Sequence, residues 1–393
     1  MKAKTENGKM TVFLEGRIDT TNAAQTEKDL LSDVESRTAD TASLVLDASE
    51  LEYISSAGLR VLMKLRKSFG GDISVINVSP DVYDIFEVTG FNELFTVEKR
   101  FRELSVDGCE IIGKGFYGTV YRIDPETIVK VYNTPDSLPM IRNEQNLAKR
   151  AFIKGVPTAI SYDIVKVGDC YGSVFELLNA DTFNDILIHQ PERFDEMLRI
   201  YIGFIKTVHS AEMDAGTLPM ARDIFIGYLD VIKNYLTAEQ HECLKKLLSA
   251  LPDDLHIVHG DFQMKNVMLV DNEPMLIDMD TLSTGQPIFD LQALYVTYVL
   301  FGEDDPNNLR DFLGLPNDLG SRIWQSIIRY YFDTDDAAKL AEISDKIRLA
   351  ASVRFLYLLA VTDLKNGKLG TKRIRRAQQY ISELISKYDS LIL

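Results

Sequence analysis

Apolar residues recur in two different periodic patterns along the chain. In the first hundred residues, short apolar runs alternate with segments whose apolar positions recur every three or four residues. Strands have period two and helices period 3.6, so this stretch predicts an α/β layer. We expect Thr20 or Thr21 to cap its first helix. The expected strands and helices cover residues 9–17, 43–47 and 73–78, and residues 21–36, 56–69 and 80–89, respectively.

A second pattern begins near Asp107, after an expected linker over residues 103–108. From about residue 185 the chain is mostly amphipathic helix, interrupted over 255–282 by short strands and loops. Before that come strands around a glycine-rich turn, a helix and further strands, over residues 109–135, 137–153 and 162–178. This order predicts a small β-rich lobe followed by a larger helical lobe.

Composition narrows the class of protein. No apolar run approaches the roughly 20 residues that a membrane span needs, and the first residues lack the apolar stretch of a signal peptide, so we expect a cytoplasmic protein. Three widely spaced cysteines predict reduced thiols. A formal charge of −16 disfavours nucleic acid and anionic membranes as partners.

The first candidate functional motif is the glycine-rich turn Gly113-Lys-Gly115-Phe-Tyr-Gly118-Thr-Val120. β-Branched residues continue after it, which favours a strand–turn–strand hairpin over a strand that runs into a helix. Glycines in such a hairpin let backbone N–H groups approach the phosphates of a nucleotide. A plain tight turn is the alternative.

Lys130 lies within the apolar run Ile128-Val-Lys130-Val-Tyr132. A lysine there must reach solvent or meet an anion, because burying its charge alone is costly. Its position after the glycine turn predicts a phosphate contact, with Glu144 on the next helix as its ion-pair partner. An outward-facing lysine on an edge strand is the alternative.

The strongest signal is His259-Gly-Asp261-Phe-Gln-Met-Lys-Asn266, followed by Leu276-Ile-Asp278-Met-Asp280. Phosphoryl transfer needs one carboxylate beside the acceptor hydroxyl, and Asp261 fits. An amide oxygen and a second carboxylate would bind Mg²⁺, which Asn266 and Asp278 provide. Asp280 is a further candidate metal ligand. Each residue taken alone is also a common turn residue.

Together these residues resemble the aminoglycoside/choline phosphotransferase family, whose catalytic loop has the form HGDxxxxN. The resemblance implies a bilobal, protein-kinase-like α+β fold with an N-lobe over 108–180 and a C-lobe over 181–393. It also implies transfer of the γ-phosphate of ATP to a hydroxyl of a small molecule, with Mg²⁺ as cofactor.

The resemblance also assigns roles to residues of this chain. Asp261 becomes the catalytic base, and Asn266 and Asp278 become metal ligands. Lys130 holds phosphate and pairs with Glu144. The nucleotide-binding residues would be completed by Gly113, Gly115, Gly118 and Val120 at the phosphates, and by Phe175 and the backbone of Glu176 and Leu178 at adenine.

Some features differ from protein kinases. The interval between Asp280 and Asp290 is too short for a long activation segment, which favours a small-molecule acceptor. We expect Asp290 to cap or brace the helix that follows it. Acidic residues at 303–305 and at 333, 335 and 336 would suit a cationic acceptor, or form solvated loops.

The segment from Leu44 to Arg60, LVLDASELEYISSAGLR, resembles STAS domains, the family of bacterial anti-sigma-factor antagonists. The resemblance implies an α/β domain over residues 1–104 that binds a protein partner. It also implies phosphorylation at Ser56, with Ser55 where many members have aspartate. The alternative is that Ser55 or Ser56 only caps the helix.

Three functions remain open at this point. The first is a small-molecule kinase with a STAS-like regulatory domain. The second is a signalling kinase that phosphorylates Ser56 or a partner protein. The third is a nucleotide-binding scaffold without activity.

Overall fold

A computed structural model describes residues 3–6, 8–35, 41, 43–115 and 117–393. The chain forms two compact units. The first contains Met1–Asp107 and Ile164–Gly172, and the second contains Gly108–Asp163 and Ser173–Leu393.

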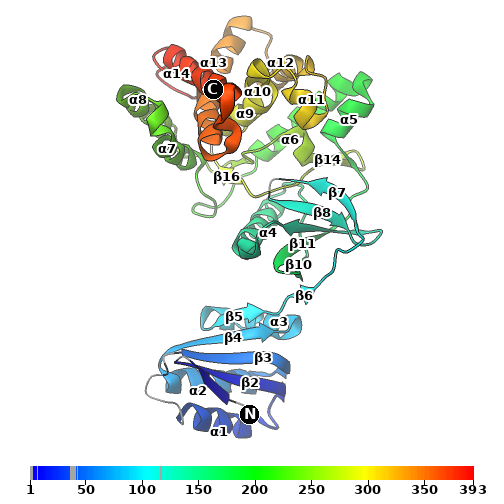
Figure 1. The fold of residues 1–393 in the computed structure, drawn as a ribbon, viewed down its shortest axis with the longest axis vertical. Coiled ribbons are helices and arrows are strands. Elements are labelled where there is room, and N and C mark those ends of the chain that lie inside the picture. The colour runs from blue at the N-terminus through cyan, green and yellow to red at the C-terminus, as the bar shows by residue number, and fades with distance from the viewer. Residues whose placement is uncertain (1–2, 7, 36–40, 42, 116) are drawn as a thin grey trace. The chain divides into compact units, whose positions relative to one another are not determined.

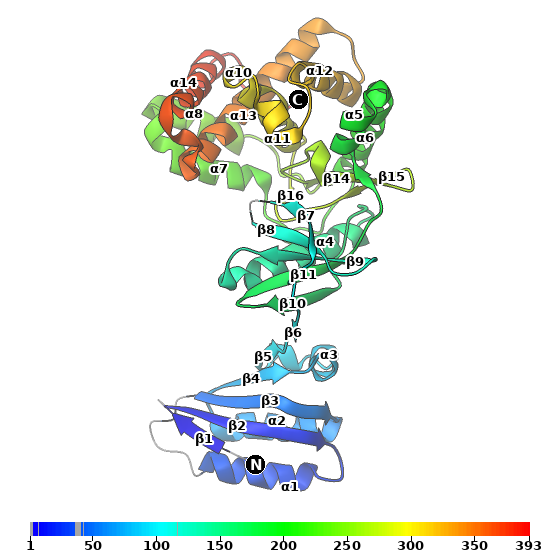
Figure 2. The same cartoon turned by 45° about the vertical axis from the view of Figure 1, so that its right-hand side comes forward.

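The first unit is built on a five-stranded sheet in the order β1-β2-β3-β4-β5 (Figure 1). β1 is antiparallel to β2, and the other neighbouring strands pair in parallel. Helices α1 and α2 lie side by side on one face (Figures 1 and 2). The elements are β1 (Ala3–Glu6), β2 (Lys9–Ile18), α1 (Ala23–Glu35), β3 (Ser43–Ile54), α2 (Ser56–Phe69), β4 (Asp72–Val78), α3 (Pro80–Val88), η1 (Phe91–Glu93) and β5 (Thr96–Lys99).

The predicted α/β layer is confirmed, with one local correction. Helix α1 begins at Ala23, so neither Thr20 nor Thr21 is its cap. The Thr21 hydroxyl instead donates to Asp19 Oδ1 at 2.6 Å, because a short polar side chain can bond its own turn in place of a helix end. The sheet buries Val12, Leu44 and other strand residues against the helices.

A second sheet has the strand order β6-β10-β11-β9-β8-β7. β7, β8 and β9 form an antiparallel meander, as the glycine-turn pattern predicted. The expected linker begins within β6, which pairs in parallel with β10. The elements are β6 (Arg102–Glu103), β7 (Glu110–Lys114), β8 (Gly118–Arg122), β9 (Thr127–Tyr132), η2 (Pro135–Ser137), α4 (Leu138–Ile153), β10 (Asp163–Val167) and β11 (Cys170–Glu176).

The chain after β11 is mainly helical, which confirms the predicted β-rich lobe followed by a helical lobe (Figure 2). Its helices pack around one large apolar core that includes Phe183, Tyr201 and Phe262. The helices are α5 (Phe183–His189), η3 (Pro191–Arg193), α6 (Phe194–His209), α7 (Ala221–Ile232), η4 (Lys233–Tyr235), α8 (Ala238–Ser249), η5 (Met264–Asn266), α9 (Ile288–Tyr295), η6 (Val296–Leu300), α10 (Phe301–Asp304), α11 (Asn308–Leu313), α12 (Leu319–Phe332), α13 (Ala337–Val361), η7 (Asp363–Lys365) and α14 (Gly367–Leu384).

Two small sheets accompany these helices, and all of their strands except β12, which precedes α5, lie between α8 and α9. One joins β13 to β16, and the other has the order β12-β14-β15. Their strands are β12 (Asp181–Thr182), β13 (Ile257–Val258), β14 (Val267–Val270), β15 (Glu273–Leu276) and β16 (Ser283–Thr284). Within the described ranges of the chain, no helix is both long and apolar enough to span a bilayer.

Candidate active site

Asp261 lies on the loop that follows β13, and its two carboxylate oxygens differ in their surroundings. Oδ2 accepts hydrogen bonds from Gln263 Nε2 at 2.8 Å and from Asn266 Nδ2 at 3.1 Å. Oδ1 takes no hydrogen bond from the residues that the structure describes. The bonds to Oδ2 fix the carboxylate, so Oδ1 is available to accept a proton from a bound hydroxyl.

The loop is held from below by Asp290, which is fully buried. Its carboxylate accepts from the backbone N–H groups of His259 at 2.8 Å and Gly260 at 2.5 Å, and it contacts His209 Nε2 at 2.8 Å. Burial favours the neutral acid, but His209 and the backbone donors outweigh it and hold the pKa of Asp290 below its ordinary value. The expectation that Asp290 caps or braces the helix that follows it is therefore corrected: it braces the loop that carries Asp261.

Three tyrosines fix the same loop from the helices around it. Tyr201 on α6 donates to the carbonyl of Phe262, and Tyr298 accepts from the Met264 N–H at 3.0 Å. Tyr331 on α12 contacts the other ring nitrogen of His209, Nδ1, at 2.8 Å. Tyr298 belongs to η6, a π-helical turn between α9 and α10. The sequence motif identified the loop but none of these supports.

The two predicted metal ligands lie next to each other. The Ile277 N–H donates to the carbonyl of Asn266 at 2.9 Å, which brings Asp278 beside the loop. The amide nitrogen of Asn266 is bonded to Asp261, so its amide oxygen is the atom left for a cation. Asp278 has a φ of 65°, in the left-handed region that aspartate tolerates better than most residues.

Lys130 on β9 lies between two carboxylates. Its Nζ is 2.7 Å from Asp278 Oδ1 and 3.1 Å from Glu144 Oε1, so the predicted ion pair with Glu144 forms. Tyr132 donates to the second oxygen of Glu144 at 2.5 Å. Burial lowers the pKa of Lys130, but the two carboxylates outweigh burial and raise it above its ordinary value. Lys130 is therefore charged and fixed in place.

The carboxylates of this region outnumber its cations. Asp280 has a pKa raised to about 7, first by burial and then by the negative charges of Asp278 and Glu144. Oxygen ligands with surplus negative charge are what Mg²⁺ requires. The residues present therefore fit a magnesium ion. No described group of three His, Cys, Asp or Glu side chains is arranged to hold a metal alone, so phosphate oxygens would complete the ligand set.

The charge on Asp280 gives a pH-dependent prediction. The unfolded chain releases this proton near pH 4 and the folded protein near pH 7, so ionised Asp280 destabilises the fold increasingly from pH 4 to 7. We expect Asp280→Asn to raise Tm, on the order of 5 °C at pH 8 and much less at pH 5. Thermal unfolding with EDTA present measures this, and an equal gain at both pH values would contradict it.

The glycine turn connects β7 and β8. The Gly115 N–H donates to the Gly118 carbonyl at 2.9 Å, and Val120 lies opposite Lys130 in the β8–β9 pair. A Cβ on Gly118 would lie 2.4 Å from the Val131 carbonyl oxygen, so a side chain cannot fit there. Gly115, in contrast, faces open space apart from one contact at 3.8 Å. Gly113 lies within β7 against Val120.

The predicted adenine segment lies at the end of β11. Phe175 is half-buried and Glu176 is exposed. The Leu177 N–H donates to the Glu126 carbonyl at 2.7 Å, which ties this segment to the turn between β8 and β9. Leu178 follows directly and is half-buried.

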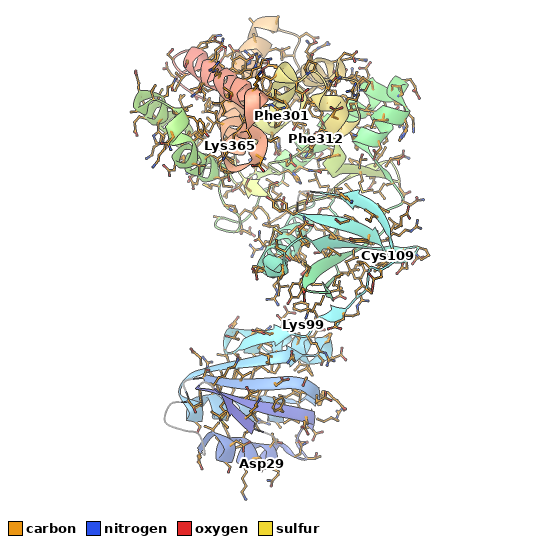
Figure 3. All side chains as sticks on the ribbon, in the orientation of Figure 1. Asp29, Lys99, Cys109, Phe301, Phe312 and Lys365 are labelled. Atoms are coloured by element: carbon orange, nitrogen blue, oxygen red, sulfur yellow. The ribbon has the colours of Figure 1, made fainter. Side chains whose placement is uncertain are left out.

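Lys265, inside the catalytic loop, was not singled out from the sequence. Its Nζ lies 4.1 Å from the ring centroid of Phe312, a side chain labelled in Figure 3. Burial lowers the pKa of Lys265, and the nearby charges of Asp261 and Asp278 oppose that shift. A second cation therefore lies near the Asp261 carboxylate.

Most of the acidic residues considered for a cationic acceptor have partners within the chain. Asp304 is bonded by Arg376 at 2.9 Å, and Tyr380 donates to Glu303 at 3.0 Å. Asp336 caps α13, and Asp335 pairs with Arg329 at 2.6 Å. The carboxylates at 303–305 are thus held within the helical lobe, whereas Asp333 is exposed and Asp335 remains 78% exposed beside Arg329.

In the first unit, Ser55 and Ser56 have different roles. Ser55 is the N-cap of α2, because its hydroxyl accepts from the backbone N–H groups of Ala57 and Gly58. Ser56 is the first residue of the helix and is exposed. The helix is capped without Ser56, so its hydroxyl is available for modification.

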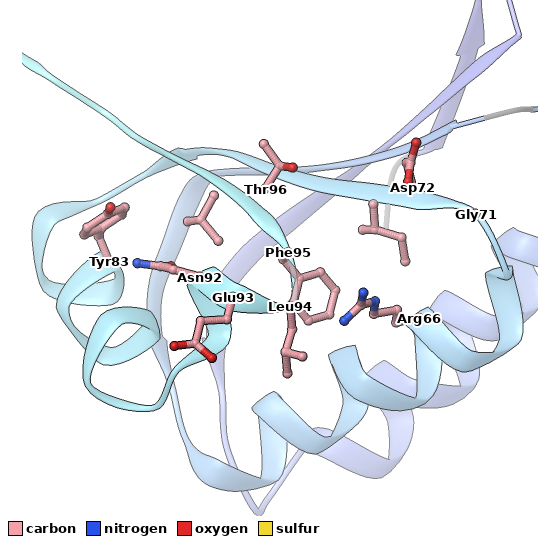
Figure 4. A pocket seen from close by; sticks show the side chains of 11 residues that line it. Arg66, Gly71, Asp72, Tyr83, Asn92, Glu93, Leu94, Phe95 and Thr96 are labelled. Carbon is pink, nitrogen blue, oxygen red and sulfur yellow. The ribbon is translucent and has the colours of Figure 1, made fainter. Parts of the chain in front are cut away.

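The first unit also has an open hollow of about 530 Å³ (Figure 4). Arg66, Tyr83, Asn92 and Phe95 contribute to its lining. Arg66 is in the last turn of α2, about 15 Å along the helix axis from Ser56. This hollow is therefore separate from the predicted phosphorylation site.

Family comparison agrees with the geometry of both units. Residues 108–317, more than half of the chain, match the model described as "Phosphotransferase enzyme family". The chain belongs to this family. Residues 1–104 match the STAS domain model. Both resemblances drawn from the sequence are confirmed, and so is the prediction of a phosphotransferase.

Individual relatives of this phosphotransferase are more distant. A Bordetella bronchiseptica protein named as an anti-sigma factor antagonist, BtrV, is 34% identical over 94 residues, which are 23% of this chain and 78% of the relative. ADP-bound aminoglycoside phosphotransferase APH(2'')-Ib is 16% identical, with 77% of this chain and 98% of that one covered and a TM-score of 0.48. A variant of APH(4)-Ia with ADP and hygromycin B is 13% identical, with 72% and 94% covered and a TM-score of 0.48.

Proposed function

We propose that this phosphotransferase moves the γ-phosphate of ATP to a hydroxyl of a small molecule and requires Mg²⁺. The observation that supports this most directly is the pair of oxygens on Asp261. One oxygen is fixed by Gln263 and Asn266, and the other is free to accept a proton. That arrangement suits a general base, which must be held still and keep one lone pair for the acceptor.

Every bond and proton of the proposed transfer can be accounted for. The acceptor oxygen forms a bond to the γ-phosphorus, the bond from that phosphorus to the β,γ-bridging oxygen breaks, and ADP leaves. The hydroxyl proton goes to Asp261 Oδ1. Asn266 and Asp278 would hold Mg²⁺, which would offset the negative charge of the phosphates.

The remaining residues would bind and orient ATP. Lys130 would contact the α- and β-phosphates, and Glu144 fixes its position. Lys265 would offset negative charge at the γ-phosphate. The glycine turn would cover the phosphates with backbone N–H groups, and the backbone at Glu176 and Leu178 would bond adenine beside Phe175.

The test is ADP formation with a panel of hydroxylated small molecules. We expect at least one class of acceptor to stimulate ADP release, to gain one phosphate by mass, and to do so only with Mg²⁺. No stimulation by any class, or equal rates in EDTA, would contradict the proposal. Peptide acceptors in the same panel test the alternative of a protein substrate.

We propose a second event in the first unit, phosphorylation of Ser56 by a partner kinase or by the phosphotransferase unit. It is favoured because Ser55 caps the helix and Ser56 does not. A phosphate on Ser56 would lie at the positive end of α2, with Arg60 one turn further along the helix.

Intact mass measures this event after incubation with Mg²⁺-ATP, alone and with cell extract. We expect one added phosphate on wild type and on Ser55→Ala, and none on Ser56→Ala. An unmodified wild-type protein in both conditions would contradict the Ser56 proposal without touching the first.

A further inference from the structure

Two half-buried tyrosines of the helical lobe stack on each other. Tyr228 on α7 and Tyr357 on α13 have ring centroids 3.8 Å apart and planes inclined by 19°. Helices α7 and α13 pack against each other within the helical lobe (Figure 2). Both residues are partly exposed, and aromatic rings of this kind can pack against a ring of a ligand.

Ring contacts and strands connect this pair to the catalytic loop. Phe225 lies 5.1 Å from Tyr228 and 4.9 Å from Phe289, the residue before Asp290. The start of α7 is also tied to β16, because the Thr284 N–H donates to the Pro219 carbonyl at 3.0 Å. β16 pairs with β13, which runs directly into the catalytic loop. The tyrosine pair therefore has a fixed position relative to the loop.

Tyr117 of the glycine turn lies near both the carboxylates and the tyrosine pair. Burial raises the pKa of Tyr117, with further contributions from the charges of Asp280, Tyr357 and Asp278. Its side chain is 49% exposed. Tyr117 is therefore within electrostatic range of both the carboxylates and Tyr357, which indicates that the tyrosine pair lies on the side of the helical lobe that faces the glycine turn.

Arg354 is one turn before Tyr357 on α13 and is half-buried. It lies close enough to oppose the rise in the pKa of Tyr228 that burial causes. Among the described residues, no carboxylate comes within ion-pair distance of Arg354. Arg348, on the same helix, has both Asp345 and Tyr295 as partners.

A half-buried arginine without a carboxylate partner is unusual in this chain, which has 59 acidic residues against 43 basic ones. A half-buried guanidinium without a carboxylate leaves donors that suit a planar anion, either carboxylate or phosphate. The acidic residues at 303–305, which would have suited a cation, are held by arginines, a lysine and a tyrosine.

We infer that the acceptor of this enzyme is an anionic ring compound that carries a hydroxyl. Its ring lies on Tyr228 and Tyr357, its carboxylate or phosphate binds Arg354, and its hydroxyl faces Asp261. This inference rests on the proposed phosphoryl transfer, and it names the class of acceptor. It also excludes polycationic acceptors as preferred substrates, since Arg354 would repel them.

The experiment uses two matched sets of acceptors. One set is glucose, glucuronate, glucose 1-phosphate and glucosamine; the other is benzyl alcohol with a neutral, carboxylate or aminomethyl group in the para position. We expect wild type to favour the anionic members by at least tenfold in kcat/KM. A comparison of kcat/KM for glucuronate and for glucose 1-phosphate shows which of the two anions, carboxylate or phosphate, the enzyme prefers.

Arg354→Gln is the decisive variant, and Arg375→Gln makes the same change of charge on the exposed side of α14. We expect Arg354→Gln to raise KM for anionic acceptors by 10- to 100-fold, with KM for ATP and kinetics with neutral acceptors unchanged. Arg375→Gln should behave as wild type. Tyr357→Leu should weaken neutral and anionic members alike, because it removes ring contact and no charge.

Calorimetric titration with a non-hydrolysable ATP analogue separates this inference from the proposed transfer. If no acceptor reacts but anionic members bind wild type and not Arg354→Gln, the acceptor class stands and the transfer is wrong. A preference for the amines, or equal affinity of wild type and Arg354→Gln for the anions, overturns the inference.

Discussion

Asp261→Asn is expected to lower kcat for phosphate transfer by about 10²- to 10⁴-fold and to leave ATP affinity unchanged. The amide oxygen of asparagine can keep the bonds from Gln263 and Asn266. Its other atom is then an NH₂ group, which cannot accept the proton of the acceptor. The loop therefore keeps its shape while the base is lost.

Steady-state ADP release measures kcat, and titration with a fluorescent nucleotide measures binding. Asp271→Asn is the matched control, because Asp271 is an exposed turn residue with a φ of 50°, which asparagine adopts well. Wild-type kcat in Asp261→Asn would exclude Asp261 as the base. Loss of nucleotide binding in that variant would show instead that the change disturbs the site.

Asp290→Ala is expected to destabilise the phosphotransferase unit by about 3–5 kcal/mol. The substitution leaves the backbone N–H groups of His259 and Gly260 without their acceptor, and it removes the partner of His209 Nε2. Asp290→Asn should cost less, because one acceptor oxygen remains. The pKa of Asp290 is lowered, so its contribution is present above the unfolded pKa near 4 and is lost only in stronger acid.

Trp324 on α12 provides the signal, since the chain has a single tryptophan and it is buried in the helical lobe. Urea unfolding followed by its fluorescence therefore reports on this unit and not on the first. Asp336→Ala, which removes a helix cap, should cost only about 1 kcal/mol. If Asp290→Ala unfolds at the same urea concentration as Asp336→Ala, the brace contributes little.

The sequence was sufficient for features that depend on local order. The hairpin around Gly113, Gly115 and Gly118 follows from glycines placed between β-branched runs, and helix 56–69 was predicted with its observed bounds. The pairing of Lys130 with Glu144 could also be anticipated, because a charge in an apolar strand needs a nearby partner.

The supports of the site could not be predicted in the same way. Asp290 and His209 are 81 positions apart, and neither lies in a pattern that indicates the other. Tyr228 and Tyr357 each read as an ordinary helical aromatic, and only the packing of α7 on α13 stacks them. For Asp290, the short interval after Asp280 suggested a local role, whereas the fold turns its carboxylate towards the loop.

The π-helical turn η6 places Tyr298 against the Met264 N–H. A π turn holds one residue more than the α-helical path around it, so it is an insertion that the helix absorbs without breaking. Removing one residue from Val296–Leu300 would restore a regular α-helical turn and change the directions of the side chains within it, including that of Tyr298. The helices before and after the turn would keep their positions, but the Met264 N–H would lose its acceptor. The loop that carries Asp261 thus depends on a single surplus residue in a neighbouring helix, and a one-residue deletion there would disturb activity more than it disturbs the fold.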